Sequence, residues 1–176
     1  LPIARVGADS PLAGRALRCI ETPGHARHHL TVHDPRANVC FTGDVFGLSY
    51  RDFDTAKGPF ILPTTSPVQF DPEALHASIE RLVALEPEAM YLTHYGRVEH
   101  APKLAAELHM QIDAMVGLAR AAHGKPDRHA TLVESLTDFY AARAQDHGWQ
   151  RGRDALRDLL GMDIELNAQG LEVWLD

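Results

Sequence analysis

Three residues in this chain have types and positions suited to metal chemistry. His25 ends the segment TPGH, Asp44 ends the segment TGD, and His94 begins the segment HYG. Each lies at the end of a short run of β-forming residues, in a turn whose glycine lets the backbone turn tightly. Two imidazoles and one carboxylate are suitable ligands for zinc or another divalent transition ion. The sequence therefore predicts a metal site, provided that the fold brings these three side chains together.

The elements that must position these side chains are three predicted strands. They cover residues 15–21, 39–42 and 89–93, and each ends at one of the three polar turns. Residues 30–33 alternate in polarity, and the turn at 34–38 predicts a hairpin into the second of these strands. If the strands are neighbours in one sheet, their ends meet at one edge, where ligand sites of α/β sheets usually lie.

Most of the remaining chain is predicted to be helical. Asp71 followed by Pro72 is a typical helix start, and Pro87 would stop that helix. A second helix is predicted from about Pro102 to Gly124. Apolar residues at helical spacing mark these two helices and two more: Leu75, Ile79, Leu82 and Val83; Leu104, Leu108, Ile112, Met115 and Ala119; Leu132, Leu136, Phe139 and Tyr140; Leu156, Leu159 and Leu160.

The chain is predicted to divide near residue 100. Residues 1–100 are rich in β-forming segments, and residues 101–176 are helical. Gly161 is expected to end the fourth helix, and residues 162–176 suit both a helix and a strand, of which we favour the helix. No strand is predicted before the first of the three. The fold class is therefore expected to be α/β, in the broad sense that includes α+β.

Composition limits the classes of function. A chain of 176 residues suits one domain, or one domain with an appendage. Its 17 Lys and Arg against 24 Asp and Glu give a charge of -7, which disfavours nucleic acid as a partner. No apolar run reaches the ~18 residues of a membrane span and no signal peptide is evident, so a cytoplasmic location is expected. Cys19 and Cys40 lie in apolar segments without metal-site spacing, which favours buried thiols.

The motifs ETPGH, VCFTGDVF and LTHYG, in this order, resemble the second half of the fold of the metallo-β-lactamase hydrolase superfamily, an αββα sandwich. By this resemblance residues 1–100 are the C-terminal half of the sandwich and residues 101–176 are a helical C-terminal extension. The resemblance implies that His25 binds one metal ion, His94 binds a second and Asp44 bridges them. The implied cofactors are two divalent ions, with zinc as the default and iron or manganese as alternatives.

One family signature is missing from this chain. The motif H-x-H-x-D-H, which lies in the first half of the family's fold, occurs nowhere in the 176 residues. The segment HARHH at 25–29 lacks both its alternate histidines and its aspartate. We therefore expect the chain to be the C-terminal part of a longer protein, to have the missing N-terminal half as its partner, and to be inactive alone.

Two neighbouring histidines follow the first motif. If His28 and His29 alternate as residues of a strand do, one faces the metals and the other faces away. The inward one is then a candidate to orient a metal ligand through a ring nitrogen. The alternative is a packing or surface role for both.

The loop at 51–71 is longer than a plain connector, and loops of this length are often functional. Phe60 is a candidate wall of an apolar substrate pocket, and Thr65 and Ser66 are candidate hydrogen-bonding groups. The alternative is that the aromatic residues attach the loop to the core. Tyr95, beside His94, is a candidate to stabilise a developing oxyanion.

The resemblance implies a metallohydrolase that acts on a small-molecule ester, thioester or lactone through a metal-bound hydroxide beside Asp44. Phosphodiesters are weaker candidates because the chain is acidic. A non-catalytic ligand-binding module of the same fold and a di-iron oxidoreductase are the rival functions. The sequence upstream of Leu1 discriminates between enzyme and binding module, because an intact H-x-H-x-D-H there favours the enzyme. A homodimer is also compatible with the sequence.

Overall fold

The computed structural model describes residues 9–12, 14–65, 67 and 69–176. Within these residues, six strands form one sheet in the order β1-β2-β3-β4-β5-β6. All neighbours are antiparallel except β4 and β5, which are parallel. The strands are β1 Asp9–Leu12, β2 Arg15–Glu21, β3 Leu30–Asp34, β4 Val39–Gly43, β5 Ala89–Leu92 and β6 Gly96–Val98.

The hairpin between β3 and β4 forms where the turn residues predict it. Asp34 Oδ1 accepts hydrogen bonds from the backbone N–H groups of Arg36 at 3.0 Å and Ala37 at 3.2 Å. Asn38 takes a positive φ of 49°, a conformation that asparagine tolerates better than most residues. The hairpin sets the register that places Thr42, Gly43 and then Asp44 at the end of β4.

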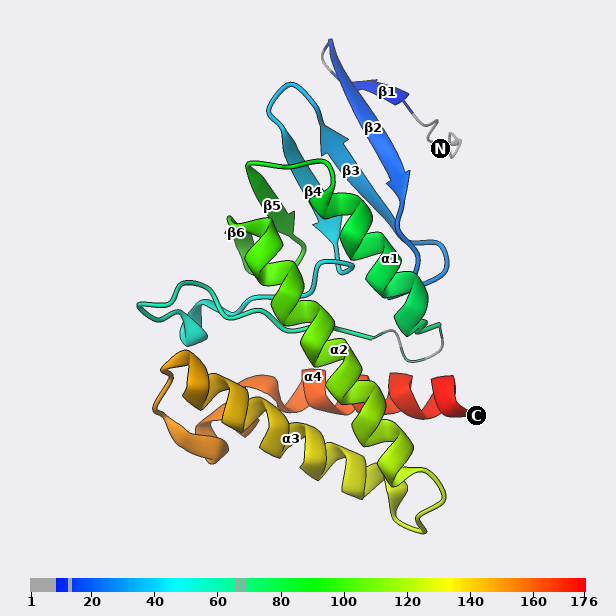
Figure 1. The fold of residues 1–176 in the computed structure, drawn as a ribbon, viewed down its shortest axis with the longest axis vertical. Coiled ribbons are helices and arrows are strands. Elements are labelled where there is room, and N and C mark those ends of the chain that lie inside the picture. Colours follow the sequence, from blue (N-terminus) through cyan, green and yellow to red (C-terminus); the bar gives the residue numbers. More distant parts are fainter. Residues whose placement is uncertain (1–8, 13, 66, 68) are drawn as a thin grey trace, which may run out of the picture.

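Four α-helices complete the described chain: α1 Pro72–Val83, α2 Ala101–Ala122, α3 Arg128–His147 and α4 Gly152–Leu175. The predicted cap of α1 is present, because Asp71 Oδ1 accepts a hydrogen bond of 3.0 Å from the N–H of Ala74. Helices α1 and α2 lie across one face of the sheet, and the α3–α4 pair runs beyond its lower end (Figure 1). The mixed architecture confirms the predicted fold class.

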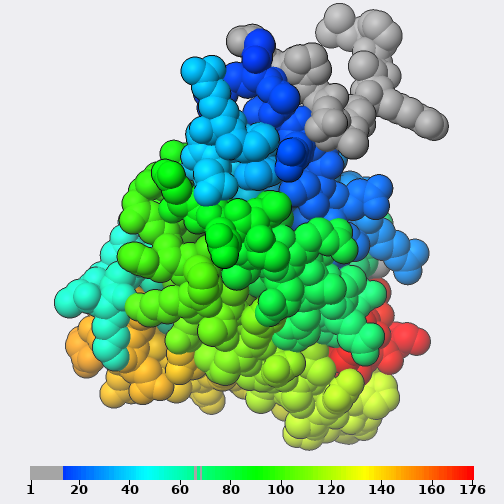
Figure 2. Space-filling view, turned by 45° about the horizontal axis from the view of Figure 1, so that its top comes forward, coloured from blue at the N-terminus to red at the C-terminus, as the bar shows by residue number. Residues whose placement is uncertain are grey.

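One hydrophobic cluster joins the sheet, the loop after β4 and all four helices. It includes Met90 of β5, Leu108 of α2, Leu136 of α3 and Leu160 of α4, all fully buried. The space-filling view shows the helices packed closely below the strands, while the β1–β2 end projects from the top (Figure 2). The predicted division of the chain into two parts near residue 100 remains a prediction. The hydrophobic core is continuous across this position and does not test it.

The opposite face of the sheet carries exposed apolar side chains. Phe41 of β4 is 47% exposed and stacks on Tyr91 of β5, with ring centroids 5.1 Å apart. Leu30 of β3 is 43% exposed. Since β4 alternates, its neighbours Cys40 and Thr42 point to the buried face, under the helices.

Three details differ from the sequence-based expectation. The strand β2 does have a partner before it, because β1 pairs with it in antiparallel register. Gly96 opens the short strand β6 instead of only closing a turn. Gly161 does not end a helix: α4 continues through it to Leu175, so the helix favoured for 162–176 is confirmed. The cost of about 1 kcal/mol for a helical glycine is outweighed by burial of the apolar residues on both sides.

The segment from residue 45 to residue 65 runs between the sheet and the α3–α4 pair (Figure 1). It contains the 3-10 helix η1, Arg51–Phe53, and a bridge between Leu48 and Leu62. Asn167 of α4 anchors the segment, since its Oδ1 accepts from the N–H of Thr65 at 2.8 Å. Residues 45–65 therefore form a layer of the fold between the sheet and the α3–α4 pair.

Both cysteines are free thiols, and Cys40 is fully buried, while Cys19 is partly exposed. Burial raises the pKa of the Cys40 thiol to about 11, so it stays protonated at neutral pH. No α-helix in the described part of the chain has both the length and the apolar composition that a bilayer crossing requires.

Candidate metal centre

The parallel pairing of β4 and β5 brings Asp44 and His94 together. Gly43 is registered against Leu92, so the chain leaves both strands at the same edge of the sheet. The N–H of Thr93 donates to the carbonyl oxygen of Gly43 at 3.5 Å. His94 Nε2 then lies 3.5 Å from Asp44 Oδ1. The two residues are adjacent because of the sheet, although they lie far apart in the sequence.

His25 reaches the same carboxylate from the turn after β2. Its Nδ1 lies 3.0 Å from the carbonyl oxygen of Thr64. Because a carbonyl oxygen only accepts, Nδ1 carries a proton, and in the neutral ring Nε2 is then the nitrogen with the lone pair. This Nε2 lies 3.7 Å from Asp44 Oδ2. The structure thus brings His25, Asp44 and His94 into one cluster.

The cluster fits divalent ions in two respects. Two donors bound at ~2.0–2.1 Å to one tetrahedral ion lie ~3.4 Å apart, close to both histidine–aspartate distances. The two imidazoles face different oxygens of one carboxylate, and Oδ1 of Asp44 is buried with no hydrogen-bond partner in the described chain. A buried carboxylate oxygen without a partner is costly unless a cation or a donor meets it.

The cluster is not a complete ligand set for one ion. Among the described residues, no three His, Cys, Asp or Glu side chains are grouped closely enough to hold a metal ion. On this geometry each ion would receive one imidazole and one carboxylate oxygen from these residues. The role of the three side chains as metal ligands therefore remains a prediction.

His29 is the inward member of the histidine pair, and it holds the backbone of Asp44. Its Nε2 accepts a hydrogen bond of 3.0 Å from the N–H of Asp44. Its Nδ1 therefore carries the proton and donates to Thr22 Oγ1 at 3.0 Å. Thr22 in turn contacts Thr31 Oγ1 at 3.2 Å, and Thr31 donates to the carbonyl oxygen of Thr42 at 3.4 Å. This chain of hydrogen bonds links β2, β3 and β4 beneath the cluster.

Burial lowers the pKa of His29, and the neighbouring His25 lowers it further. The lowered pKa favours the neutral ring that can accept from Asp44. The imidazole also lies directly against Gly43, since a Cβ there would be 2.4 Å from His29 Nε2. His28 is exposed instead. Sequence alone could not choose between the two histidines, because the segment from Thr22 to His29 is a turn and not a strand.

The histidine pair provides a matched test. His29→Ala is expected to destabilise the chain by about 1–3 kcal/mol, because it leaves the N–H of Asp44 without its acceptor. His28→Ala should change stability by less than about 0.5 kcal/mol, since that side chain is exposed. Urea unfolding of both variants measures the difference. Equal effects at the two positions would contradict the role of His29.

A tyrosine pair lies beside His94. The rings of Tyr50 and Tyr95 are 4.2 Å apart, and the Tyr50 hydroxyl donates to Asp163 Oδ2 of α4 at 2.6 Å. Burial raises the pKa of the Asp163 carboxyl, while the Tyr50 hydrogen bond and the nearby His94 oppose that rise. Sequence reasoning missed Tyr50 and Asp163, because no local pattern links positions so far apart. The oxyanion role of Tyr95 stays a prediction.

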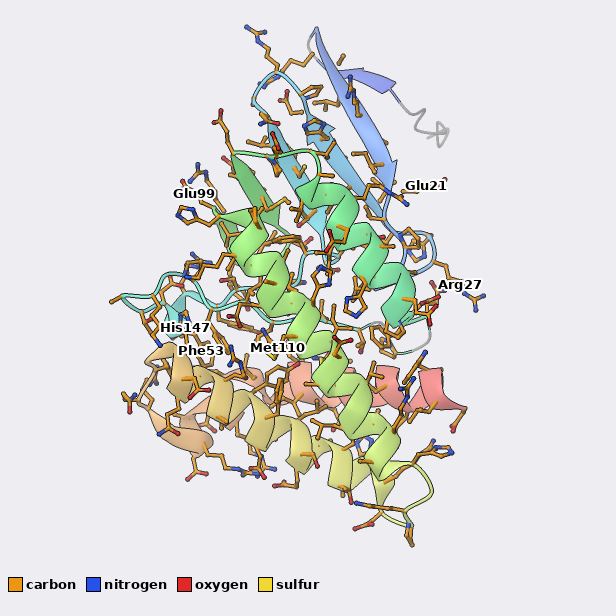
Figure 3. All side chains as sticks on the ribbon, in the orientation of Figure 1. Glu21, Arg27, Phe53, Glu99, Met110 and His147 are labelled. Carbon is orange, nitrogen blue, oxygen red and sulfur yellow. The ribbon has the colours of Figure 1, made fainter. Side chains whose placement is uncertain are left out.

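Phe60 is buried in the hydrophobic core. It packs against Phe53 and His147, with ring centroids 5.4 Å and 5.3 Å away. Phe53 and His147 come from the loop and from the end of α3, and they lie close together at one side of the molecule (Figure 3). These contacts favour the alternative in which the aromatic residues attach the loop to the core.

Thr65 is also engaged elsewhere. Its N–H donates to Asn167, and its hydroxyl donates to the carbonyl oxygen of Leu166 at 3.3 Å. These bonds attach the loop to α4 and engage the N–H and the hydroxyl of Thr65. Ser66, the second predicted hydrogen-bonding residue, lies outside the described residues.

The sheet with its histidine and aspartate residues at the strand ends defines the class of protein. The chain belongs to the metallo-beta-lactamase superfamily, whose family model matches residues 4–94. The metallo-beta-lactamase fold-containing protein ST1585 of Sulfurisphaera tokodaii is 32% identical over 112 residues, which are 60% of this chain and 39% of that protein. The resemblance seen in the motifs is therefore confirmed.

Solved structures agree with this assignment. The crystal structure of ST1585, described as an archaeal metallo-beta-lactamase superfamily protein from Sulfolobus tokodaii, aligns with a TM-score of 0.54 and 26% identity, over 93% of this chain and 48% of that one. The metallo-beta-lactamase family protein TTHA1429 from Thermus thermophilus aligns with a TM-score of 0.58 and 19% identity, over 98% and 48%, and shows the fold alone. The chain spans less than half the length of each of these relatives. The superfamily includes metal-dependent hydrolases and typically binds divalent metals.

Proposed function

We propose that this chain supplies His25, Asp44 and His94 to the dinuclear metal centre of a hydrolase. The observation that carries the proposal is the position of the Asp44 carboxylate between two imidazoles, one facing each oxygen at 3.7 Å and 3.5 Å. A carboxylate in this position can bridge two cations and neutralise part of their charge. The remaining ligands would come from the H-x-H-x-D-H segment of the family.

Each of these residues has a support that fixes its donor atom. The Thr64 carbonyl holds the proton of His25 on Nδ1, which leaves Nε2 free to bind a cation. His29 holds the backbone of Asp44, so the carboxylate keeps its place between the two rings. Divalent ions in such a centre lower the pKa of a water molecule and polarise the scissile carbonyl. Zinc suits this ligand set, and iron and manganese accept it too.

The proposed substrates are small esters, thioesters or lactones. The charge of -7 opposes the approach of polyanions such as nucleic acids. The neighbouring rings of Tyr50 and Tyr95 give the surface beside His94 an aromatic character, which suits a small neutral substrate. Tyr95 is 49% exposed, so its ring is accessible to a ligand.

The test uses the protein that carries this chain together with the H-x-H-x-D-H segment. His25→Ala and His94→Ala should each reduce the metal content measured by elemental analysis and the hydrolysis of an ester, thioester and lactone panel. His123→Ala, a change at an exposed histidine after α2, is the matched control and should leave both unchanged. Full metal content and full turnover in either site variant would overturn the proposal. If the site variants lose metal but the parent protein hydrolyses none of these substrates, the result would favour the non-catalytic alternative.

A further inference from the structure

A second pair of histidines meets outside the candidate metal centre. Helices α1 and α2 lie side by side across the sheet (Figure 1), and His76 of α1 faces His109 of α2. The ring planes are 23° apart and the ring centroids are 4.8 Å apart, so the two rings meet edge to edge at their Nδ1 atoms. The two Nδ1 atoms are only 2.6 Å apart. Neither the proposed hydrolase nor the packing of the core requires this arrangement.

Each imidazole also faces a carboxylate from the opposite helix. His76 Nε2 lies 3.2 Å from Asp113 Oδ1, and Asp113 follows His109 by one turn of α2. His109 Nε2 lies 2.8 Å from Glu80 Oε1, and Glu80 follows His76 by one turn of α1. The first contact has hydrogen-bond geometry. The second is an ion-pair contact only, and the buried Nε2 of His109 has no hydrogen-bond partner in the described chain.

The carboxylates leave the two Nδ1 atoms facing each other. If Nε2 of each ring carries a proton toward its carboxylate, the Nδ1 atoms both have lone pairs and can share at most one proton between them. Two lone pairs 2.6 Å apart repel each other unless a proton or another cation lies between them. A carboxylate behind an imidazole is the usual setting of a metal-binding histidine, because it fixes the tautomer and raises the basicity of the free nitrogen.

We infer that His76 and His109 form a second site for a divalent transition ion such as zinc, nickel or copper, where the ion replaces the shared proton. Nitrogen donors on one tetrahedral ion lie ~3.3 Å apart, so the rings need to separate by less than ~1 Å. The side chains of His76 and His109 are 28% and 23% exposed, so an ion can enter from solvent. Water completes the coordination, because the described residues contain no three-residue ligand group.

The site would tie α1 to α2. Helix α1 also supports the candidate metal centre, since Gly24, next to His25, lies against Leu75, the neighbour of His76. An ion held by His76 and His109 therefore stabilises the layer behind the TPGH turn without touching the three predicted ligands. With two protein donors the affinity should be moderate, and binding should weaken at low pH because protons compete for the same nitrogens.

The experiment uses the protein that carries this chain together with the H-x-H-x-D-H segment, with His25→Ala, His94→Ala and alanine at the histidines of that segment, which removes the candidate metal centre. Calorimetric titration with Zn²⁺ should show one ion per chain, and Cu²⁺ should give an electron paramagnetic resonance spectrum with two nitrogen ligands. Adding His76→Gln or His109→Gln should weaken Zn²⁺ binding by more than about tenfold, and Asp113→Asn by about tenfold. Adding His123→Gln, at an exposed histidine outside the pair, should have no effect.

Far-UV circular dichroism establishes that each variant is folded, and Asp113→Asn supplies a second test because Asp113 is exposed and its change should not unfold the chain. Absence of stoichiometric Zn²⁺ binding would overturn the inference. So would equal binding by the parent and both histidine variants, or a loss of binding in His123→Gln. None of these outcomes depends on hydrolase activity, so the proposed function stands or falls separately.

Discussion

Asp44→Asn is expected to remove bound metal and hydrolysis together from the protein with a complete centre. Asparagine keeps the shape of the side chain, and the backbone bond to His29 does not involve the carboxylate. It removes the negative charge and replaces one of the two oxygens that face His25 and His94. Changes that only disturb the support of a metal ligand typically cost 10–100-fold, so the loss of a bridging ligand should exceed about 100-fold.

Elemental analysis and initial rates on the same preparation give both quantities. Asp146→Asn on α3 is the matched control, because it makes the same chemical change at an exposed position. A variant at Asp44 that retains full metal content and near-parental rates would exclude a bridging role. A fall in rate with full metal content would assign Asp44 to substrate contact instead.

Gly24→Ala is expected to have the largest effect on stability. A Cβ at this position would lie 2.3 Å from both Cα and N of Leu75, and Gly24 has a φ of +133°. Both clashes are with the backbone of α1, which cannot rotate away as a side chain can. Overpacking and an unfavourable backbone conformation each cost about 1–3 kcal/mol, so a loss of about 3–5 kcal/mol is expected in urea unfolding.

Gly161→Ala in α4 is the control for this change. Outside the neighbouring backbone of the helix itself, no described atom lies within 4 Å of the added Cβ there, and the backbone is helical. Alanine should therefore stabilise the chain by about 0.5–1 kcal/mol. Similar stabilities for the two variants would show that the TPGH turn does not lie against α1.

The strand ends and helices were predictable because their signals are local. A run of β-forming residues that ends in a polar turn marks β2 from Arg15 to Glu21, and the cap at Asp71 marks the start of α1. The sequence also predicted that Asp44 and His94 lie at one edge of the sheet, because ligand sites gather at strand ends. The contact itself depends on the pairing of β4 with β5, which no local pattern encodes.

The hydrogen bonds that support the cluster were harder to predict from the sequence. The hydrogen bond from Asp44 to His29 and the bond from His25 to Thr64 each join separate segments. Tyr50 and Asp163 lie on different elements and carry no motif. Gly161 was misassigned because its local penalty is visible in the sequence, while the burial that offsets it depends on the tertiary structure.

The parallel pairing of β4 with β5 has a consequence for the order of folding. Parallel strands need a long crossover, here the 45–70 segment and α1, and closing so large a loop is slow compared with forming a hairpin. The β2–β3–β4 meander can therefore form before Asp44 and His94 meet. Metal ions would therefore bind at this edge only after β4 and β5 have paired. They would slow the unfolding of the sheet without guiding its assembly.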